Sequence, residues 1–369
     1  MQIISIPAEA TIKYGAAWDG FSDSLSGPGS IHYNNSLISD SPAIRSAVLD
    51  YTKHTVMPAL IDCHVHLNLP TKNNDTPVNR ANKFLQSGIA AVREAGSPPG
   101  TKAPLSPLKV INTIQAIYRS GCYGSNLGTS VEDVSAALHT IDRLADSGAG
   151  QIKIIASGIF SFTNYGETGA VPFTTNELTR MVTHAKAAGL KVMAHATGDE
   201  AVQRCLEAGV DTIEHGYFIS EETLHKMAEN DTAWIPTLIP AAIHLLEPKL
   251  SKNLSAHQRE TLRRTLERHR QLVAKAAGLN VCIGAGTDAG AVGVPHGPSL
   301  LWEITQLISC GLTNVAALKS ATSHAARICG FSGYGKLTPG QRSPVLVLEK
   351  NPLKQITTLQ EPVALLIPS

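Results

Sequence analysis

The sequence lacks a long apolar run and a strong charge of either sign. It contains no stretch of about 18 consecutive apolar residues, the length that a membrane-spanning helix requires. Its 31 Lys and Arg residues nearly balance its 30 Asp and Glu residues, the formal net charge is +1, and no dense basic cluster occurs. Such a weak field would attract neither nucleic acid nor an anionic membrane, so we expect a small-molecule partner.

The sequence also lacks a disulfide framework and a signal peptide. Its six cysteines are scattered without a Cys-x-x-Cys pair, in a chain too long to need disulfides for stability. The first twenty residues have no basic start, no continuous apolar stretch and no small-residue cleavage site. We therefore expect reduced cysteines and a cytoplasmic protein. The oligomeric state stays open, a homo-oligomer included.

The chain is long enough for a large domain and a small one. With 369 residues, it exceeds the usual length of a single domain. Hydrophobic residues make up 43% and charged residues 17% of the sequence, which is ordinary for a globular enzyme. A disordered or fibrous chain is excluded.

The pattern of apolar residues changes near residue 56. Residues 1–55 alternate short strand-like stretches with turn clusters, and from Val56 onward short apolar runs alternate with amphipathic helical stretches. That alternation is typical of βα units around a parallel sheet. The eight expected strands are Val56–Val65, Gly88–Val92, Leu108–Ile114, Gln151–Ile155, Leu190–Ala194, Thr212–Glu214, Thr232–Leu238 and Asn280–Gly284. The clearest expected helices are Val131–Ser147, Thr175–Gly189 and His257–Ala277.

The end of the chain returns to strand-like sequence. Two such stretches, Ser343–Glu349 and Pro362–Ile367, are separated by a turn. We expect the strand-rich chain ends to pair with each other. The predicted fold is thus an α/β chain with a (β/α)8 TIM barrel at 56–334 and a small β-sandwich domain formed by 1–55 and 335–369.

Five of the eight predicted barrel strands carry, at or near their ends, a residue that can bind a metal ion. His64 and His66 end the first strand, and side chains at i and i+2 share one face of a strand, so both imidazoles can reach one ion. Barrel enzymes carry their active sites at these carboxyl ends. The other candidate ligands are Lys153, His195, His215 and Asp288, each on a different strand.

Each of these residues also has an ordinary structural interpretation. A His-x-His pair occurs by chance in many chains, and Lys153 could extend its charged head into solvent. Asp288, followed by Ala-Gly, could cap a helix. The joint occurrence of these side chains at successive strand ends favours a metal site over separate structural roles.

The candidate ligands lie in characteristic segments of the sequence, and a further such stretch follows near its end. The segments are Pro58–Leu67, Ile152–Gly158, His195–Gly198, Ile213–Gly216 and Gly286–Gly290, and the C-terminal stretch runs from Ala321 through Gly335–Leu337 to Pro352. Together they resemble the amidohydrolase superfamily, within the branch of imidazolonepropionase-like proteins and prolidase-like zinc carboxypeptidases. The resemblance spans nearly the whole chain and is highly specific for the superfamily.

The resemblance implies a hydrolase with a binuclear zinc centre that activates a water. His64, His66 and Asp288 would bind one ion, and His195 and His215 the other. Lys153, carboxylated by carbon dioxide, would bridge them; a buried lysine is driven towards its neutral amine, which can react with carbon dioxide. Asp288 would shuttle a proton from the attacking water to the leaving nitrogen. Such a ligand set suits zinc and tolerates Mn²⁺, Co²⁺ or Fe²⁺.

The sequence departs from the family near the expected substrate. Arg93-Glu94 stands where Arg-Asp is usual, and Thr197 stands where relatives carry His or Tyr. Substrate contacts are therefore expected to differ. The candidate substrate-binding residues are Tyr217, His296 and Arg93, and a structural role remains the alternative for each.

Three functions remain open on the sequence. The first is hydrolysis of a dipeptide or N-acyl amino acid, favoured by Lys153 at the bridging position. The second is hydrolysis of a cyclic amide, as in imidazolonepropionase-like proteins, or of another small amide, carbamate or lactone, at a mononuclear site. The third is a catalytically silent barrel that binds a partner, which the complete ligand set disfavours, because unpaired buried His and Asp side chains would be costly.

Overall fold

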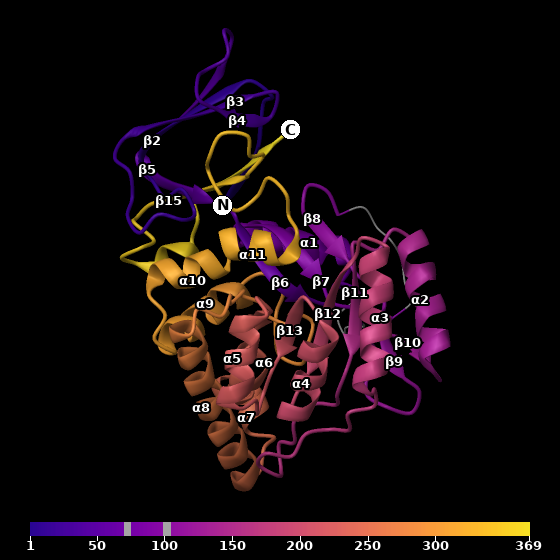
Figure 1. Ribbon diagram of the computed structural model, residues 1–369. Helices are drawn as coiled ribbons and strands as arrows, with labels where there is room; N and C mark the ends of the chain where they lie inside the picture. Colours follow the sequence, from indigo (N-terminus) through magenta and orange to yellow (C-terminus); the bar gives the residue numbers. More distant parts are fainter. Residues whose placement is uncertain (70–74, 99–104) are drawn as a thin grey trace.

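The computed structural model describes residues 1–69, 75–98 and 105–369 and shows a large α/β unit joined to a smaller sheet (Figure 1). Successive strands of the large unit run parallel, and helices lie around their outside (Figure 1). The fold is a TIM barrel with an additional domain, as the sequence predicts. None of the helices in the described ranges is long and apolar enough to cross a membrane.

The barrel strands fall into two hydrogen-bonded groups. The first three strands pair in the order β6-β7-β8, and the later strands pair in the order β10-β9-β11-β12-β13-β14. The strands are β6 (Leu60–Val65), β7 (Ile89–Glu94), β8 (Lys109–Asn112), β9 (Ala116–Arg119), β10 (Gly128–Val131), β11 (Gln151–Ile155), β12 (Lys191–Ala196), β13 (Thr212–His215) and β14 (Ala233–Ile235).

Two irregular segments join these groups into a closed barrel. The third strand position is divided: β8 pairs with β7, whereas β9, three residues later, pairs with β11. The eighth position, expected at Asn280–Gly284, is present only as isolated parallel bridges from Ile283 to Trp234 and from Ala289 to Val65. Hydrogen bonds from Cys63 N to Ala285 O (2.9 Å) and from His66 N to Ala289 O (2.8 Å) attach this segment to β6.

The helices of the barrel begin at side chains that satisfy free backbone N–H groups. Thr174 and Glu177 form a capping box at α3 (Thr175–Ala187), and Ser255 and Gln258 form one at α8 (Ala256–Gly278). The predicted helices at these positions and at α2 (Val134–Asp146) are confirmed. The other helices are α1 (Pro77–Gln86), α4 (Asp199–Ala208), α5 (Glu221–Glu229), α6 (Ile239–Leu246), α7 (Pro248–Ser251), α9 (Ser299–Ser309), α10 (Asn314–Ser320) and α11 (Ser323–Cys329), with the 3-10 helix η1 (Ile356–Gln360).

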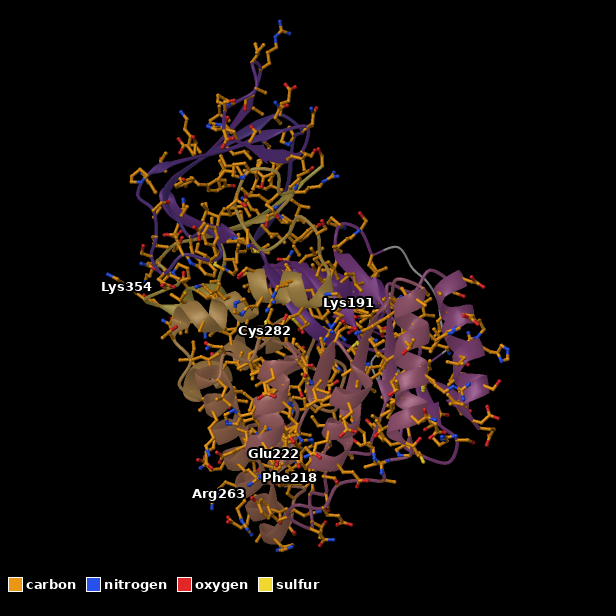
Figure 2. All side chains as sticks on the ribbon, viewed as in Figure 1. Lys191, Phe218, Glu222, Arg263, Cys282 and Lys354 are labelled. Carbon is orange, nitrogen blue, oxygen red and sulfur yellow. The ribbon has the colours of Figure 1, made fainter. Side chains whose placement is uncertain are left out.

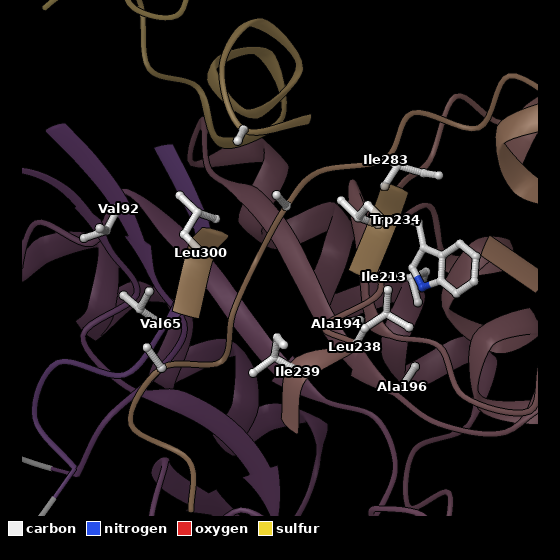
Figure 3. Packing of buried hydrophobic residues seen from close by; sticks show 14 of the residues in the cluster. Val65, Val92, Ala194, Ala196, Ile213, Trp234, Leu238, Ile239, Ile283 and Leu300 are labelled. Carbon is white, nitrogen blue, oxygen red and sulfur yellow. The ribbon is translucent and has the colours of Figure 1, made fainter. Parts of the chain in front are cut away.

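The main apolar core lies between the strands and the helices. On β12, Val192, Ala194 and Ala196 belong to this core, and the alternate residue His195 lies in the site described below. Figure 3 shows Ala194 and Ala196 within this packing, together with Trp234 of β14. Alternation along the strand therefore fixes which side chains point towards the barrel interior.

The two chain ends form one seven-stranded sheet, and the expected pairing of the ends with each other is confirmed. Its order is β1-β16-β15-β5-β2-β3-β4. The N-terminal strand pairs with the C-terminal one, in parallel, from Gln2 opposite Ala364 to Ile6 opposite Pro368. The strands are β1 (Gln2–Ile6), β2 (Ala10–Ala17), β3 (Gly29–Asn34), β4 (Leu37–Ser39), β5 (Ala47–Pro58), β15 (Val345–Leu348) and β16 (Ala364–Pro368).

The predicted first barrel strand is divided between two strands of the structure. The predicted first strand, Val56–Val65, divides at Ala59: residues up to Pro58 pair with β15, and β6 begins at Leu60. Both parts are buried and apolar, so the sequence pattern could not separate them. We propose 1–58 and 335–369 as the small domain and 60–334 as the barrel.

Candidate metal centre

The predicted histidine and aspartate ligands come together at the carboxyl ends of the barrel strands. In Figure 2, Lys191, which begins β12, and Cys282, which precedes the Ile283 bridge of the eighth barrel segment, lie towards the small sheet. Phe218, which follows β13, lies at the opposite end. The site therefore faces away from the small sheet.

His64, His66 and Asp288 form the tightest part of the site. Their ligand atoms all lie within 4.8 Å of one another. Asp288 Oδ1 is 2.9 Å from His66 Nε2 and 3.6 Å from His64 Nε2. Two imidazoles and one carboxylate at this separation are a donor set that fits a zinc ion.

His195 and His215 extend this cluster on the side of β12 and β13. The His215 ring centroid lies 5.0 Å from that of His64 and 4.6 Å from that of His195. The four imidazoles thus form a continuous group, which the sequence placed on three separate strands.

Each of the four imidazoles has one ring nitrogen beside a hydrogen-bond acceptor. His64 Nδ1 lies 2.6 Å from Glu214 Oε2, and His66 Nδ1 lies 2.5 Å from Gly96 O. His195 Nε2 lies 3.2 Å from Gly158 O, and His215 Nδ1 lies 2.7 Å from Thr237 Oγ1. When the first nitrogen donates to these acceptors, the other is left with a lone pair for an ion, which is the usual arrangement of metal-binding histidines.

Burial also keeps most of these rings neutral, as ligation requires. It lowers the pKa of His64 to about 4 and that of His195 to about 3, and the charge of Lys153 adds to both shifts. Burial holds the pKa of His215 well below its usual range. Burial would also lower the pKa of His66, but the hydrogen bond with Asp288 outweighs it and raises that pKa.

Lys153 is buried in the barrel interior below the histidines. It lies two residues before Ile155, which pairs with His195, so its Cα lies about 6.6 Å lower along the strand direction. Burial lowers the pKa of its ammonium to about 8, while Glu214 and Asp288 raise it through space rather than through hydrogen bonds. A neutral amine is accessible here, which suits reaction with carbon dioxide.

Glu214 is a site residue that the sequence analysis missed. It accepts hydrogen bonds from His64, from Arg93 Nη2 (2.7 Å) and from Thr212 Oγ1 (2.5 Å), and all of these groups are buried. Burial would raise the pKa of Glu214, but the guanidinium of Arg93 and the bond with His64 lower it to about 2. The carboxylate is therefore ionised and orients His64.

Glu214 and His215 both face the site although they are adjacent in β13. Neighbouring residues of a strand normally point to opposite faces. His215 has a left-handed backbone with φ of 68°, which breaks this alternation and turns its ring inward. Asp288 also has a left-handed φ, of 56°. Such strain concentrates at functional sites.

The structure places the three candidate substrate contacts in different surroundings. Arg93 lies buried beneath the site, where it binds Glu214 and donates through Nε to Cys63 O (2.6 Å). His296 lies behind His66, with Nε2 2.9 Å from His66 O. Tyr217 lines the cavity, but its hydroxyl donates to Thr237 O (3.2 Å).

Glu94, where relatives carry Asp, supports the loop that holds His66. Its carboxylate accepts from Gly96 N (3.1 Å), from Ser97 Oγ and from Thr113 Oγ1 (3.3 Å). The Gly96 carbonyl, which faces His66 Nδ1, is fixed by these bonds. The departure from the family pattern therefore acts on the orientation of a candidate ligand, His66.

A cavity of about 820 Å³ opens above the cluster. His66, His195, His215 and Asp288 form part of its wall. Much of the remaining lining is apolar or aromatic, including Leu69, Pro98, Tyr123, Ile159, Phe160, Phe162, Tyr217, Pro240 and Val292. Such a cavity can hold a small organic molecule against the metal ligands.

Comparison with known proteins finds relatives of moderate sequence identity. An uncharacterized protein of Mycobacterium tuberculosis is 27% identical over 319 residues, which cover 83% of this chain and 82% of that protein. Ochratoxinase of Aspergillus niger is 28% identical over 251 residues, 67% of this chain and 50% of its own.

A solved structure shares the fold. An Xaa-Pro dipeptidase, crystallised with methionine in its active site, has a TM-score of 0.79 and 24% identity, covering 96% of this chain and 97% of that one. Residues 55–366 match the Amidohydrolase family. The chain belongs to the amidohydrolase family and is a hydrolase that acts on carbon–nitrogen bonds.

Proposed function

We propose that this protein is a zinc-dependent enzyme that hydrolyses the amide bond of a dipeptide or N-acyl amino acid. His64, His66 and Asp288 would hold one ion and His195 and His215 a second. Lys153, carboxylated by carbon dioxide, would bridge them. The observation that carries this proposal is that all four imidazoles have one nitrogen beside an acceptor and can present the other to one shared site.

The ions would supply two effects, a lower pKa of a bound water and polarisation of the scissile carbonyl. The chain supplies the rest. Asp288 is 16% exposed, borders the cavity and is held by His66. Burial would raise the pKa of Asp288, but the hydrogen bond with His66, with smaller contributions from His64 and Lys153, lowers it, so the carboxylate is ionised. It can accept a proton from the attacking water and return it to the leaving nitrogen.

A cyclic amide is the second candidate substrate. Among the described residues that line the cavity there is no Lys or Arg, so none of these residues offers a guanidinium or ammonium to a free carboxylate. A neutral cyclic amide would not need one. The two candidate functions therefore predict opposite effects of a free carboxylate on the substrate. It should raise kcat/KM if the substrate is a dipeptide or N-acyl amino acid, and lower it if the substrate is a neutral cyclic amide.

The first test is the metal content of the purified enzyme together with its mass under native conditions. Two zinc ions per chain and an added carbon dioxide on Lys153 would support the binuclear site. A His195→Asn variant should lose one ion and most activity on N-acyl amino acids. The control is His257→Asn, which alters an exposed histidine of α8. Wild-type protein that binds no metal after reconstitution would overturn the proposal.

The cysteines support a cytoplasmic location as part of the same proposal. All six are free, and Cys63, Cys205, Cys310 and Cys329 are buried. Free thiols persist in a reducing compartment.

A further inference from the structure

A second hollow adjoins the metal-site cavity. It has a volume of about 520 Å³. The two hollows share part of their walls, so they lie side by side. The shared residues are Ile159, Phe160, Phe162, His244 and Val292. We call this second hollow the apolar lobe.

One wall of the apolar lobe is a folded-back loop between β11 and α3. Phe160 and Thr168 form an antiparallel bridge, and Gly169 N donates to Ile159 O at 3.0 Å. Gly158 and Gly169 are in close contact: a Cβ added at Gly158 would lie 2.7 Å from the Gly169 Cα. The two limbs of the loop are therefore held together and form an ordered wall of the apolar lobe.

The surface of this wall is aromatic. The rings of Phe160 and Phe162 stack with centroids 5.4 Å apart, and Phe162 meets His244 edge to face at 5.0 Å. Phe160 also packs on Tyr217 at 4.5 Å, and Tyr217 stacks on the buried His269 at 3.8 Å. An aromatic wall thus extends from Tyr217, which borders the metal-site cavity, to His244.

The rim exposes apolar side chains to solvent. Ile159 is 52% and Val292 69% exposed, although both border the hollow. Glu167 is the one charged residue among the described residues of the lobe. Apolar side chains around a concave site are covered when a complementary apolar ligand binds.

We infer that the apolar lobe binds a bulky aromatic or long aliphatic group on one side of the scissile amide. Phe160, Phe162, His244 and Val292 would then determine specificity. The role of the lobe in substrate specificity rests on the proposed amide hydrolysis. Binding of an apolar group to the lobe does not depend on that proposal.

Kinetics on matched substrates test the role in specificity. With the zinc-loaded enzyme, kcat/KM is compared for N-acetylglycine, N-naphthoylglycine and N-acetylnaphthylalanine. At least one naphthyl substrate should exceed N-acetylglycine by about 10-fold or more, because its ring is removed from water in the lobe. Cleavage of all three at the same kcat/KM would overturn the inference.

Variants at the rim locate the effect. Val292→Glu should reduce the ratio of kcat/KM for the preferred naphthyl substrate over N-acetylglycine, because it adds a charge at the rim. Phe162→Ala should reduce the same ratio by removing a ring of the wall. The control is Val48→Glu, at a residue of β5 that is 58% exposed on the small sheet and should leave the ratio unchanged. An unchanged ratio in both lobe variants would overturn the assignment.

Binding of naphthylmethanol, an uncharged alcohol that the enzyme cannot hydrolyse, separates the inference from the proposed function. Calorimetric binding to the wild type, weakened in Val292→Glu and kept in Val48→Glu, would support the lobe even if no amide were cleaved. In that case only the proposed reaction fails. If the amides were cleaved without a naphthyl preference and all three proteins bound the alcohol equally, the inferred role of the apolar lobe would be refuted. The proposed amide hydrolysis would still stand.

Discussion

Glu214 accepts a hydrogen bond from His64 at 2.6 Å, and neither side chain is exposed to solvent. The same carboxylate is bound by Arg93. This relationship fixes the tautomer of His64, since a proton held on Nδ1 leaves Nε2 free for an ion.

Replacing Glu214 by Gln should therefore weaken metal binding. We expect the zinc affinity to fall about 10- to 100-fold, the usual loss when the partner of a metal-binding histidine is removed. Arg93 would lose its ionic partner, so the free energy of unfolding should also fall, by about 3 kcal/mol or more. Competition with a chelator and urea unfolding measure the two effects.

The matched control is Glu222→Gln. Glu222 is 73% exposed and pairs with Lys226 on α5, so its loss should change neither quantity measurably. Unchanged zinc affinity in Glu214→Gln would show that Glu214 does not orient a ligand.

Asp288→Asn tests the proposed proton transfer. An amide cannot take up the proton of the attacking water, so kcat should fall by about 10²- to 10⁴-fold, the typical contribution of general acid–base catalysis. His195 and His215 remain, so at least one ion per chain should be retained. The measurement is kcat together with metal content. A loss of kcat smaller than about 10-fold would argue for another proton acceptor.

Chelation should lower activity and stability together. An ion that binds only the folded state stabilises it by about 2.7 kcal/mol at a free concentration of 100 times its dissociation constant. Removing zinc should therefore lower the Tm and abolish turnover, and added zinc should restore both. Loss of activity without any change in Tm would contradict a site built from five separate parts of the fold.

Glu303 should make stability depend on pH. It is buried in α9 and accepts from Leu238 N (3.0 Å) and Ile239 N (2.9 Å) at the start of α6. Burial raises its pKa from 4.5 to about 8, the two hydrogen bonds only partly opposing it. Between these values the folded state binds more protons than the unfolded state, so stability falls as pH rises.

The Glu303→Gln variant, which cannot ionise, tests this dependence. The wild type should lose stability relative to the variant between about pH 5 and about pH 8, by the order of a few kcal/mol. Urea unfolding at both values measures the difference. A difference that stays constant with pH would show that Glu303 is ionised throughout.

Gly286 allows the eighth barrel segment to approach β6. A Cβ at this position would lie 2.4 Å from Ile235 Cγ2 and 2.8 Å from His64 Cβ. Gly286→Ala should therefore displace His64, lower zinc affinity and destabilise the protein by about 1–3 kcal/mol. The control is Gly278→Ala at the end of α8, where an added Cβ meets nothing within 4 Å. Equal Tm and zinc affinity in the two variants would refute this packing argument.

The sequence by itself determined the barrel and its candidate ligands. Alternating βα units predicted the fold, and the spacing of His64 and His66 placed both on one strand face. Capping residues such as Ser255 mark helix starts locally. Strand alternation and helix caps depend on residues that are neighbours in the chain. The sequence pattern alone therefore reveals them.

The tertiary structure alone decided how the ligands are oriented. The acceptors Gly96, Gly158, Glu214 and Thr237 come from four different loops or strands, and three of them offer no signal of a metal site in the sequence. The left-handed backbone of His215 likewise breaks the strand alternation on which sequence reasoning relies.

Sequence periodicity also could not place Arg93. It was expected beside the substrate, but it lies beneath the metal site, against Glu214. The two residues are 121 positions apart and meet only when the sheet closes into a barrel. Local periodicity tells which face of a strand a side chain occupies, whereas barrel closure decides which side chains from distant strands share that interior.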